Sequence, residues 1–200
     1  MTTSHADNHD RDKLSRWNGD LSSNPPNPQL QRGARGAFPV HAVILVSEQD
    51  RLAHDIFRRF RSSFEARAAE YKHVTIFGQH GVSNTVLGLM EAFGLAATPL
   101  PLLLLFVEPW ATTIYVLPLP GGSGRAGERL VDPILVDQGW AEALAELENA
   151  VDGSAPGSGR LDLVSVPGLM AHQLPGNAAG GVAGLVGQVL QSLASTDQTN

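Results

Sequence analysis

Residues 93–106 combine an apolar helix end, a proline corner and an unbroken apolar run. The run at residues 102–105 contains only leucine, which suits a strand that is covered on both faces of a sheet. Pro101 precedes the run and Pro109 follows it, so too little length remains between them for a stable helix. The stretch therefore predicts a buried central strand within an α/β fold.

Apolar patterning on both sides of this run predicts alternating strands and helices. The run is followed so closely by the next strand that the two are expected to pair as an antiparallel hairpin. Gly94 is expected to end the preceding helix in the left-handed conformation. Strands are predicted at residues 40–46, 74–77, 102–107 and 112–117, and helices at residues 51–71, from Ser83 or Asn84 to Phe93, and 139–151.

Both ends of the chain differ in composition from this region. Residues 1–37 are rich in polar residues, proline and glycine, so we expect a disordered tail. Trp17 in this tail is either a scattered apolar side chain or an anchor that docks on the domain or on a partner. The composition predicts a flexible linker at residues 152–160 and a Gly-rich C-terminal extension at residues 161–200. A weak helical pattern at residues 178–193 predicts a helix that forms only against a surface, the alternative being a frayed tail.

The composition excludes several classes of function. The chain of 200 residues has no cysteine, which excludes disulfides, thiolate catalysis and thiol redox chemistry by the protein itself. Its formal net charge of −6 gives no reason to expect nucleic-acid binding. The sequence has no run of about 20 apolar residues, so no membrane span is predicted. The polar start of the chain lacks a signal segment, and we predict a cytoplasmic protein.

The predicted order of elements resembles the thioredoxin family over residues 38–151. The order is strand, helix, strand, helix, proline corner, two antiparallel strands and helix. Residues 93–99, Phe-Gly-Leu-Ala-Ala-Thr-Pro, resemble the thioredoxin segment that leads into the cis-proline and an apolar strand. The resemblance implies a three-layer α/β sandwich with a mixed central sheet and helices on both faces. It makes Pro99, preceded by Thr98, the expected cis-proline beside the binding groove, with Pro101 as the second choice.

The Cys-x-x-Cys motif of that family is missing from this chain. At the start of the first long helix, where the family carries the motif, the chain has His54-Asp-Ile-Phe57. The resemblance therefore implies the fold without the redox activity, and indicates an adaptor, assembly factor or chaperone-like accessory protein. Its groove is expected to bind an extended segment of a protein partner through main-chain hydrogen bonds. The Trp17 segment and the Gly-rich C-terminal helix are expected to add contacts to that partner or to a second copy. The expected groove residues are His54, Asp55, Phe57, Thr98 and Pro99.

Two alternative functions use the same surface without thiols. His54 and Asp55 can serve an enzyme as a polar pair, although we assign no catalytic residue from the sequence. The basic side chains of Arg58, Arg59 and Arg61 can bind a small anion or an acidic partner. Four histidines are candidate metal ligands: His41, His54, His73 and His80. His41 and His73 could be neighbours because they begin adjacent strands. No His-x-x-x-His motif or His/Cys cluster among these four supports a site, so no metal site and no cofactor are predicted.

Overall fold

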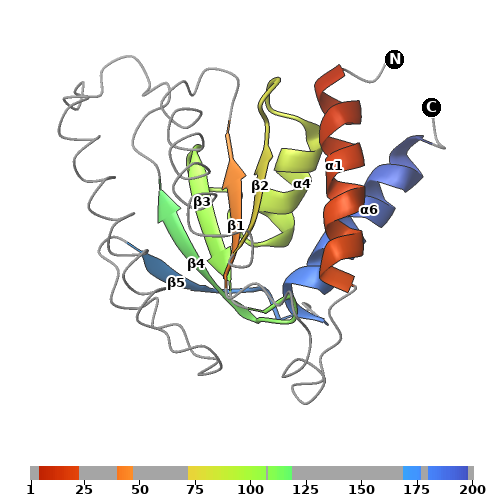
Figure 1. Cartoon of the computed structure of the whole chain (residues 1–200). Coiled ribbons are helices and arrows are strands. Elements are labelled where there is room, and N and C mark those ends of the chain that lie inside the picture. The colour runs from red at the N-terminus through yellow and green to blue at the C-terminus, as the bar shows by residue number, and fades with distance from the viewer. Residues whose placement is uncertain are drawn as a thin grey trace, which may run out of the picture.

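A computed structural model of the chain describes residues 5–22, 40–46, 72–106, 108–118, 169–176 and 180–197. These residues form a mixed α/β structure with a five-stranded sheet and three helices (Figure 1). The helices are α1 (His5–Ser22), α4 (Asn84–Ala92) and α6 (Gly181–Asp197). The strands are β1 (Val40–Leu45), β2 (Lys72–Phe77), β3 (Leu102–Phe106), β4 (Thr113–Pro118) and β5 (Met170–Gln173).

The sheet has the strand order β2-β1-β3-β4-β5. Strands β1 and β2 are parallel, whereas β3, β4 and β5 each pair antiparallel with the preceding strand in this order. Leu45 at the end of β1 pairs with Phe77 on one side and with Leu102 on the other. The ends of β1 and β2 therefore meet the start of β3 at one end of the sheet, which we call the carboxyl end (top of Figure 1). The four predicted strands and the antiparallel hairpin are confirmed.

The apolar run that forms β3 is buried on both faces of the sheet. All five residues of β3 are buried, which confirms the prediction of a strand covered on both faces. The three described helices pack against one another on one face of the sheet (Figure 1). The predicted helices at residues 51–71 and 139–151 lie outside the described residues.

The prediction of a disordered tail over residues 1–37 is wrong for residues 5–22, which form α1. Leu14, Trp17 and Leu21 follow one another at intervals of three and four, so they share one face of the helix. All three are at most 2% exposed and belong to the main core. Composition alone indicated disorder because the remaining positions of this helix are mostly polar, and polar positions face solvent in an amphipathic helix.

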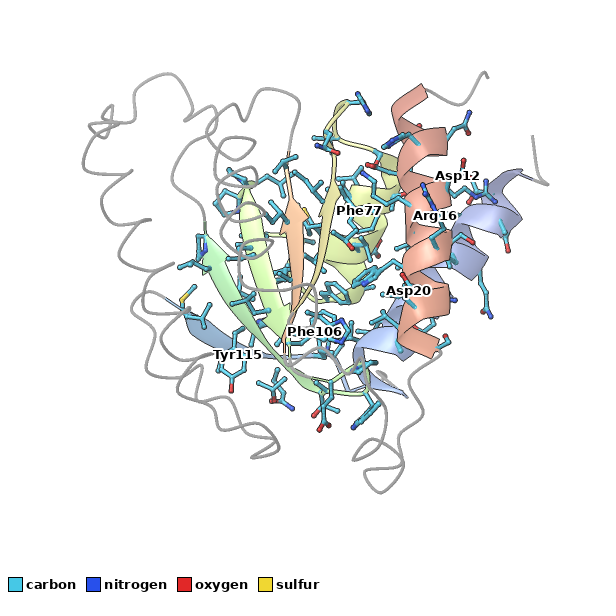
Figure 2. The ribbon with its side chains drawn as sticks, in the orientation of Figure 1. Asp12, Arg16, Asp20, Phe77, Phe106 and Tyr115 are labelled. Carbon is cyan, nitrogen blue, oxygen red and sulfur yellow. The ribbon has the colours of Figure 1, made fainter. Side chains whose placement is uncertain are left out.

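Aromatic side chains join α1 to the sheet. Figure 2 shows Phe77 and Phe106 between the strands and α1. The Trp17 ring lies 5.7 Å from the Phe77 ring and 6.2 Å from the Phe106 ring, measured between centroids. Trp17 is therefore a core residue that docks α1 on its own domain. Because its ring is buried there, it is not exposed as an anchor for a partner.

The C-terminal extension belongs to the same core, which therefore extends beyond the predicted domain limits of 38–151. Strand β5 pairs with β4, and α6 packs against both α1 and α4. The helix predicted at residues 178–193 is found as α6, docked on a surface as expected. A Cβ at Gly88 of α4 would lie 3.0 Å from the Val189 side chain, so the glycine allows the two helices to approach closely. The buried hydrophobic residues of α6 are Val182, Leu185, Val186 and Val189. The predicted linker at residues 152–160 lies outside the described residues.

The segment between α4 and β3 contains the predicted proline corner. Gly94 ends α4 with φ at 72°, the left-handed conformation expected for it. The cis peptide bond precedes Pro101, so the assignment of Pro99 as the cis-proline is wrong and the second choice is correct. Pro101 is buried where the chain enters β3, whereas Pro99 is exposed two residues earlier. Because Pro99 and Pro101 lie only two residues apart, the sequence alone does not show which of them follows the cis peptide bond.

Candidate functional site

The predicted groove residues are only partly described by the structure. Pro99 is exposed, and the half-buried Thr98 donates its backbone N–H to the Leu95 carbonyl at 2.8 Å. The structure therefore places these two residues on the surface of the turn that leads from α4 to β3. The other predicted site residues lie outside the described residues, so the enzyme and anion-binding alternatives stay predictions: His54, Asp55, Phe57, Arg58, Arg59 and Arg61.

A second group of polar side chains gathers at the carboxyl end of the sheet, where α1 crosses the connection between β2 and α4. This connection, residues 78–83, is the β2–α4 turn. Its first residue, Gly78, has φ at 87°, and a Cβ there would lie 1.8 Å from the Val46 carbonyl oxygen. Only glycine fits this approach, so the turn is held tightly against the end of β1.

Asp10 of α1 is the centre of this group. Its side chain is 2% exposed, and Oδ2 accepts hydrogen bonds from the Gly78 backbone N–H at 2.8 Å and from the Ser83 hydroxyl at 2.6 Å. A buried carboxylate needs such donors, because burial without them is costly. Asp10 therefore ties α1 to both ends of the β2–α4 turn.

Two further contacts extend this connection to the start of α4. Ser83 is the N-cap of α4, and its Oγ accepts a hydrogen bond from the Val86 N–H at 3.2 Å. Asp7 accepts the Asn84 N–H at 2.7 Å, so a second carboxylate from α1 lies at the positive end of the α4 dipole. The Ser83 hydroxyl donates to Asp10 and accepts from the helix, which is the geometry of a cap and not of a nucleophile.

Lys13 lies one turn further along α1 and contacts β2. Its Nζ donates to the Ile76 carbonyl at 2.7 Å and to Gln79 Oε1 at 3.3 Å, and lies 3.8 Å from Asp10 Oδ1. Burial lowers the pKa of Lys13 from its ordinary value, and Arg16 adds to this, while the Asp10 carboxylate opposes it. The ammonium group thus satisfies polar atoms at the end of β2 and completes the attachment of α1.

Two histidines form the solvent side of the same cluster. The rings of His9 on α1 and His80 in the turn lie edge to face, with centroids 4.9 Å apart. His9 Nδ1 is buried and lies 3.8 Å from Asp10 Oδ1. Burial lowers the pKa of His9, followed by the charges of Lys13 and His80, and Asp10 acts in the opposite direction.

These contacts define the polar cluster: Asp7, His9, Asp10, Lys13, Gln79, His80 and Ser83. Asp7, Asp10 Oδ2 and the Lys13 ammonium group each take part in contacts that hold α1 against the β2–α4 turn and the end of β2. Sequence analysis missed the cluster because α1 was expected to be disordered. The interval of three between Asp7, Asp10 and Lys13 was the available signal, since it places them on one face of a helix.

Comparison of the chain with models of known protein families, with curated proteins and with solved structures finds no match. The helices of the described segments all fall short of the length and apolar character that a membrane crossing requires. Among the side chains that the structure describes, no three histidines, cysteines or acidic residues form a group suited to a metal ion.

Proposed function

We propose that the chain is a redox-inactive, thioredoxin-like protein-binding module that acts as an adaptor, assembly factor or chaperone-like accessory protein. The observation that carries the proposal is the sheet order β2-β1-β3-β4, with β1 and β2 parallel and β3 and β4 antiparallel. The resemblance implies a mixed central sheet, and the parallel β1–β2 pair beside the antiparallel β3–β4 hairpin supports the proposal at that level. Since the chain has no cysteine, binding is the function that such a fold retains.

The turn before β3 is the surface we assign to the partner. Ala96, Ala97 and Pro99 are exposed there, while Leu95 beneath them is only 4% exposed. Small side chains and a proline leave the backbone of a turn accessible, so an extended peptide can approach it and form main-chain hydrogen bonds. The partner is thus an extended protein segment, supplied by another protein or by a second copy of this chain.

The turn that carries this surface is held in one conformation by hydrogen bonds, which favours binding of a partner. The Leu95 N–H donates to the Met90 carbonyl at 2.7 Å, and the Gly94 N–H donates to the Glu91 carbonyl at 3.0 Å, so the turn is fixed to the end of α4. A surface held in one conformation loses little entropy when a partner binds, which raises affinity at a given contact area.

A quantitative pull-down of the tagged full-length chain from its native cells tests the proposal. Wild type is compared with Pro99→Glu, which places a charge on the proposed surface, and with Gln191→Glu, which places the same charge on the exposed side of α6. We expect a stoichiometric partner whose recovery falls at least tenfold with Pro99→Glu and is unchanged with Gln191→Glu. Circular dichroism checks that each variant is folded.

A set of recovered proteins that responds equally to both variants would contradict the proposed surface. Recovery of no stoichiometric partner by the folded wild type would contradict the binding function itself. In that case the residues predicted for the alternatives become the next target, with loss of turnover in His54→Ala or loss of anion-induced thermal stabilisation in Arg58→Ala as the readouts.

A further inference from the structure

Strand β5 forms one edge of the sheet, and β4 is its only neighbour among the strands that the structure describes (Figure 1). Three of its four residues are exposed: Met170, Ala171 and Gln173. The edge is therefore open to solvent. Because an open edge presents backbone N–H and C=O groups, it can pair with a strand from another chain.

The register between β4 and β5 shows which backbone groups face outward. The Leu174 N–H donates to the Thr112 carbonyl at 2.8 Å, so residue 174 faces β4. In an antiparallel pair every second residue bonds to the neighbouring strand, and the residues between them face the other way. Ala171 and Gln173 are such intervening residues, so they direct their N–H and C=O groups away from β4.

The side chains of β5 leave these outward groups uncovered. Ala171 carries only a methyl group, and Gln173 Oε1 accepts a hydrogen bond from the Thr113 hydroxyl at 2.9 Å, toward β4. Edge strands that avoid association usually carry charges, proline or a bulge. Residues 169–174, Leu-Met-Ala-His-Gln-Leu, contain no acidic residue, lysine, arginine or proline, and the β4–β5 register is continuous. These forms of protection are therefore missing from β5.

The outward groups of β5 are complementary to those of a second copy. When two copies pair antiparallel about a two-fold axis at His172, Ala171 of each copy faces Gln173 of the other. Both outward residues then form their backbone hydrogen bonds. A shift of the register by two residues would bring Pro175, which has no N–H, opposite Ala171. A two-fold contact places a strand against itself, and the uncharged β5 does not repel its own copy.

The same register covers an exposed apolar side chain. Met170 is 54% exposed and shares one face of the strand with Leu174, which belongs to the main core. In the two-fold arrangement Met170 of each copy faces Leu174 of the other. His172 lies at the axis, where its Nε2–H donates to the Phe93 carbonyl of its own chain at 2.8 Å. The ring is thus directed to α4 and leaves the backbone edge free.

We propose that β5 is a dimerisation strand, through which two copies of the chain join their sheets antiparallel into one continuous sheet. The contact uses β5 and not the turn before β3, so it does not depend on the proposed function. A dimer of this kind carries two copies of that turn. A partner with two matching segments would then gain affinity from binding both.

Sedimentation equilibrium of the full-length chain over a hundredfold range of concentration tests the proposal with two double variants. Ala171→Glu with Gln173→Glu places carboxylates opposite each other across the axis, whereas Ala171→Lys with Gln173→Glu places opposite charges there. The two variants change the same positions and differ only at residue 171. We expect a reversible wild-type dimer. Its dissociation constant should rise at least tenfold in the first variant and stay within threefold of wild type in the second.

A wild type that stays monomeric at every concentration would overturn the proposal, and so would equal dissociation constants in the two folded variants. Pro99→Glu should leave the dimer unchanged, because loss of the dimer there would place the contact at the turn before β3. Circular dichroism monitors folding. Hydrogen exchange of the wild type needs no variant: the Ala171 and Gln173 amides should exchange more slowly at high protein concentration, and unchanged exchange would contradict the pairing.

Discussion

Asp10 and Gly78 lie 68 positions apart in the chain and are joined by a buried hydrogen bond of 2.8 Å. The bond attaches α1 to the point where β2 ends. The same glycine packs against the Val46 carbonyl, where β1 ends. Three elements from separate parts of the sequence therefore converge on one residue at the carboxyl end of the sheet, and the geometry there depends on α1.

Replacing Asp10 with alanine should lower the free energy of unfolding by about 3 kcal/mol, because the Gly78 N–H and the Ser83 hydroxyl both lose a buried charged acceptor. Urea denaturation measures the change. Asp12→Ala is the control, since Asp12 is exposed on the same helix and should cost less than about 0.5 kcal/mol. Equal effects of the two substitutions would show that the carboxylate of Asp10 does not support the turn.

Replacing Trp17 with alanine should destabilise the protein by about 4 kcal/mol, because the indole fills the space between Phe77 and Phe106 and leaves a cavity when removed. Arg16→Ala, one residue away on the exposed side of α1, should change stability by less than about 0.5 kcal/mol. Chemical denaturation of both variants compares them. If Trp17→Ala were as stable as Arg16→Ala, α1 would not belong to the core.

The central strands could be predicted because their own residues carry the signal. An unbroken apolar run identifies β3, and β-branched residues identify β1 and β2. Gly94 ends α4 in the left-handed geometry that was predicted, and Ser83 is its N-cap, one of the two positions, Ser83 or Asn84, that the sequence left open. These features are local, so they can be read without knowing the rest of the chain.

The terminal elements could not be predicted in the same way because their stability comes from distant contacts. Helix α1 depends on Trp17 packing against the sheet and on Asp10 bonding to residues far along the chain. Strand β5 is four residues long and mostly exposed, so its sequence lacks an apolar pattern, and its backbone pairing with β4 defines it. The polar cluster was missed for the same reason, since it exists only once α1 has docked.

Replacing Gly78 with alanine should lower the free energy of unfolding by at least about 3 kcal/mol, because φ is positive there and the added Cβ would clash with the Val46 carbonyl. Gly19→Ala is the matched control. Gly19 lies within α1, where an added Cβ meets no atom within 4 Å, so alanine should stabilise the helix by about 0.5–1 kcal/mol. Thermal denaturation of both variants should therefore give shifts of opposite sign, and shifts of equal sign would contradict the tight turn.

The stability of the protein should decrease at acidic pH in a way that depends on His9. Burial and the charges of Lys13 and His80 lower the pKa of His9 below its ordinary value of 6.5. The unfolded chain therefore takes up a proton at a higher pH than the folded chain, so the free energy of unfolding falls as pH decreases from 6.5 through the folded pKa. His9→Gln should remove this contribution, so its profile should fall less steeply. Urea denaturation between pH 7.5 and about pH 5 compares the two proteins. Parallel profiles would mean that protonation of His9 is not linked to folding.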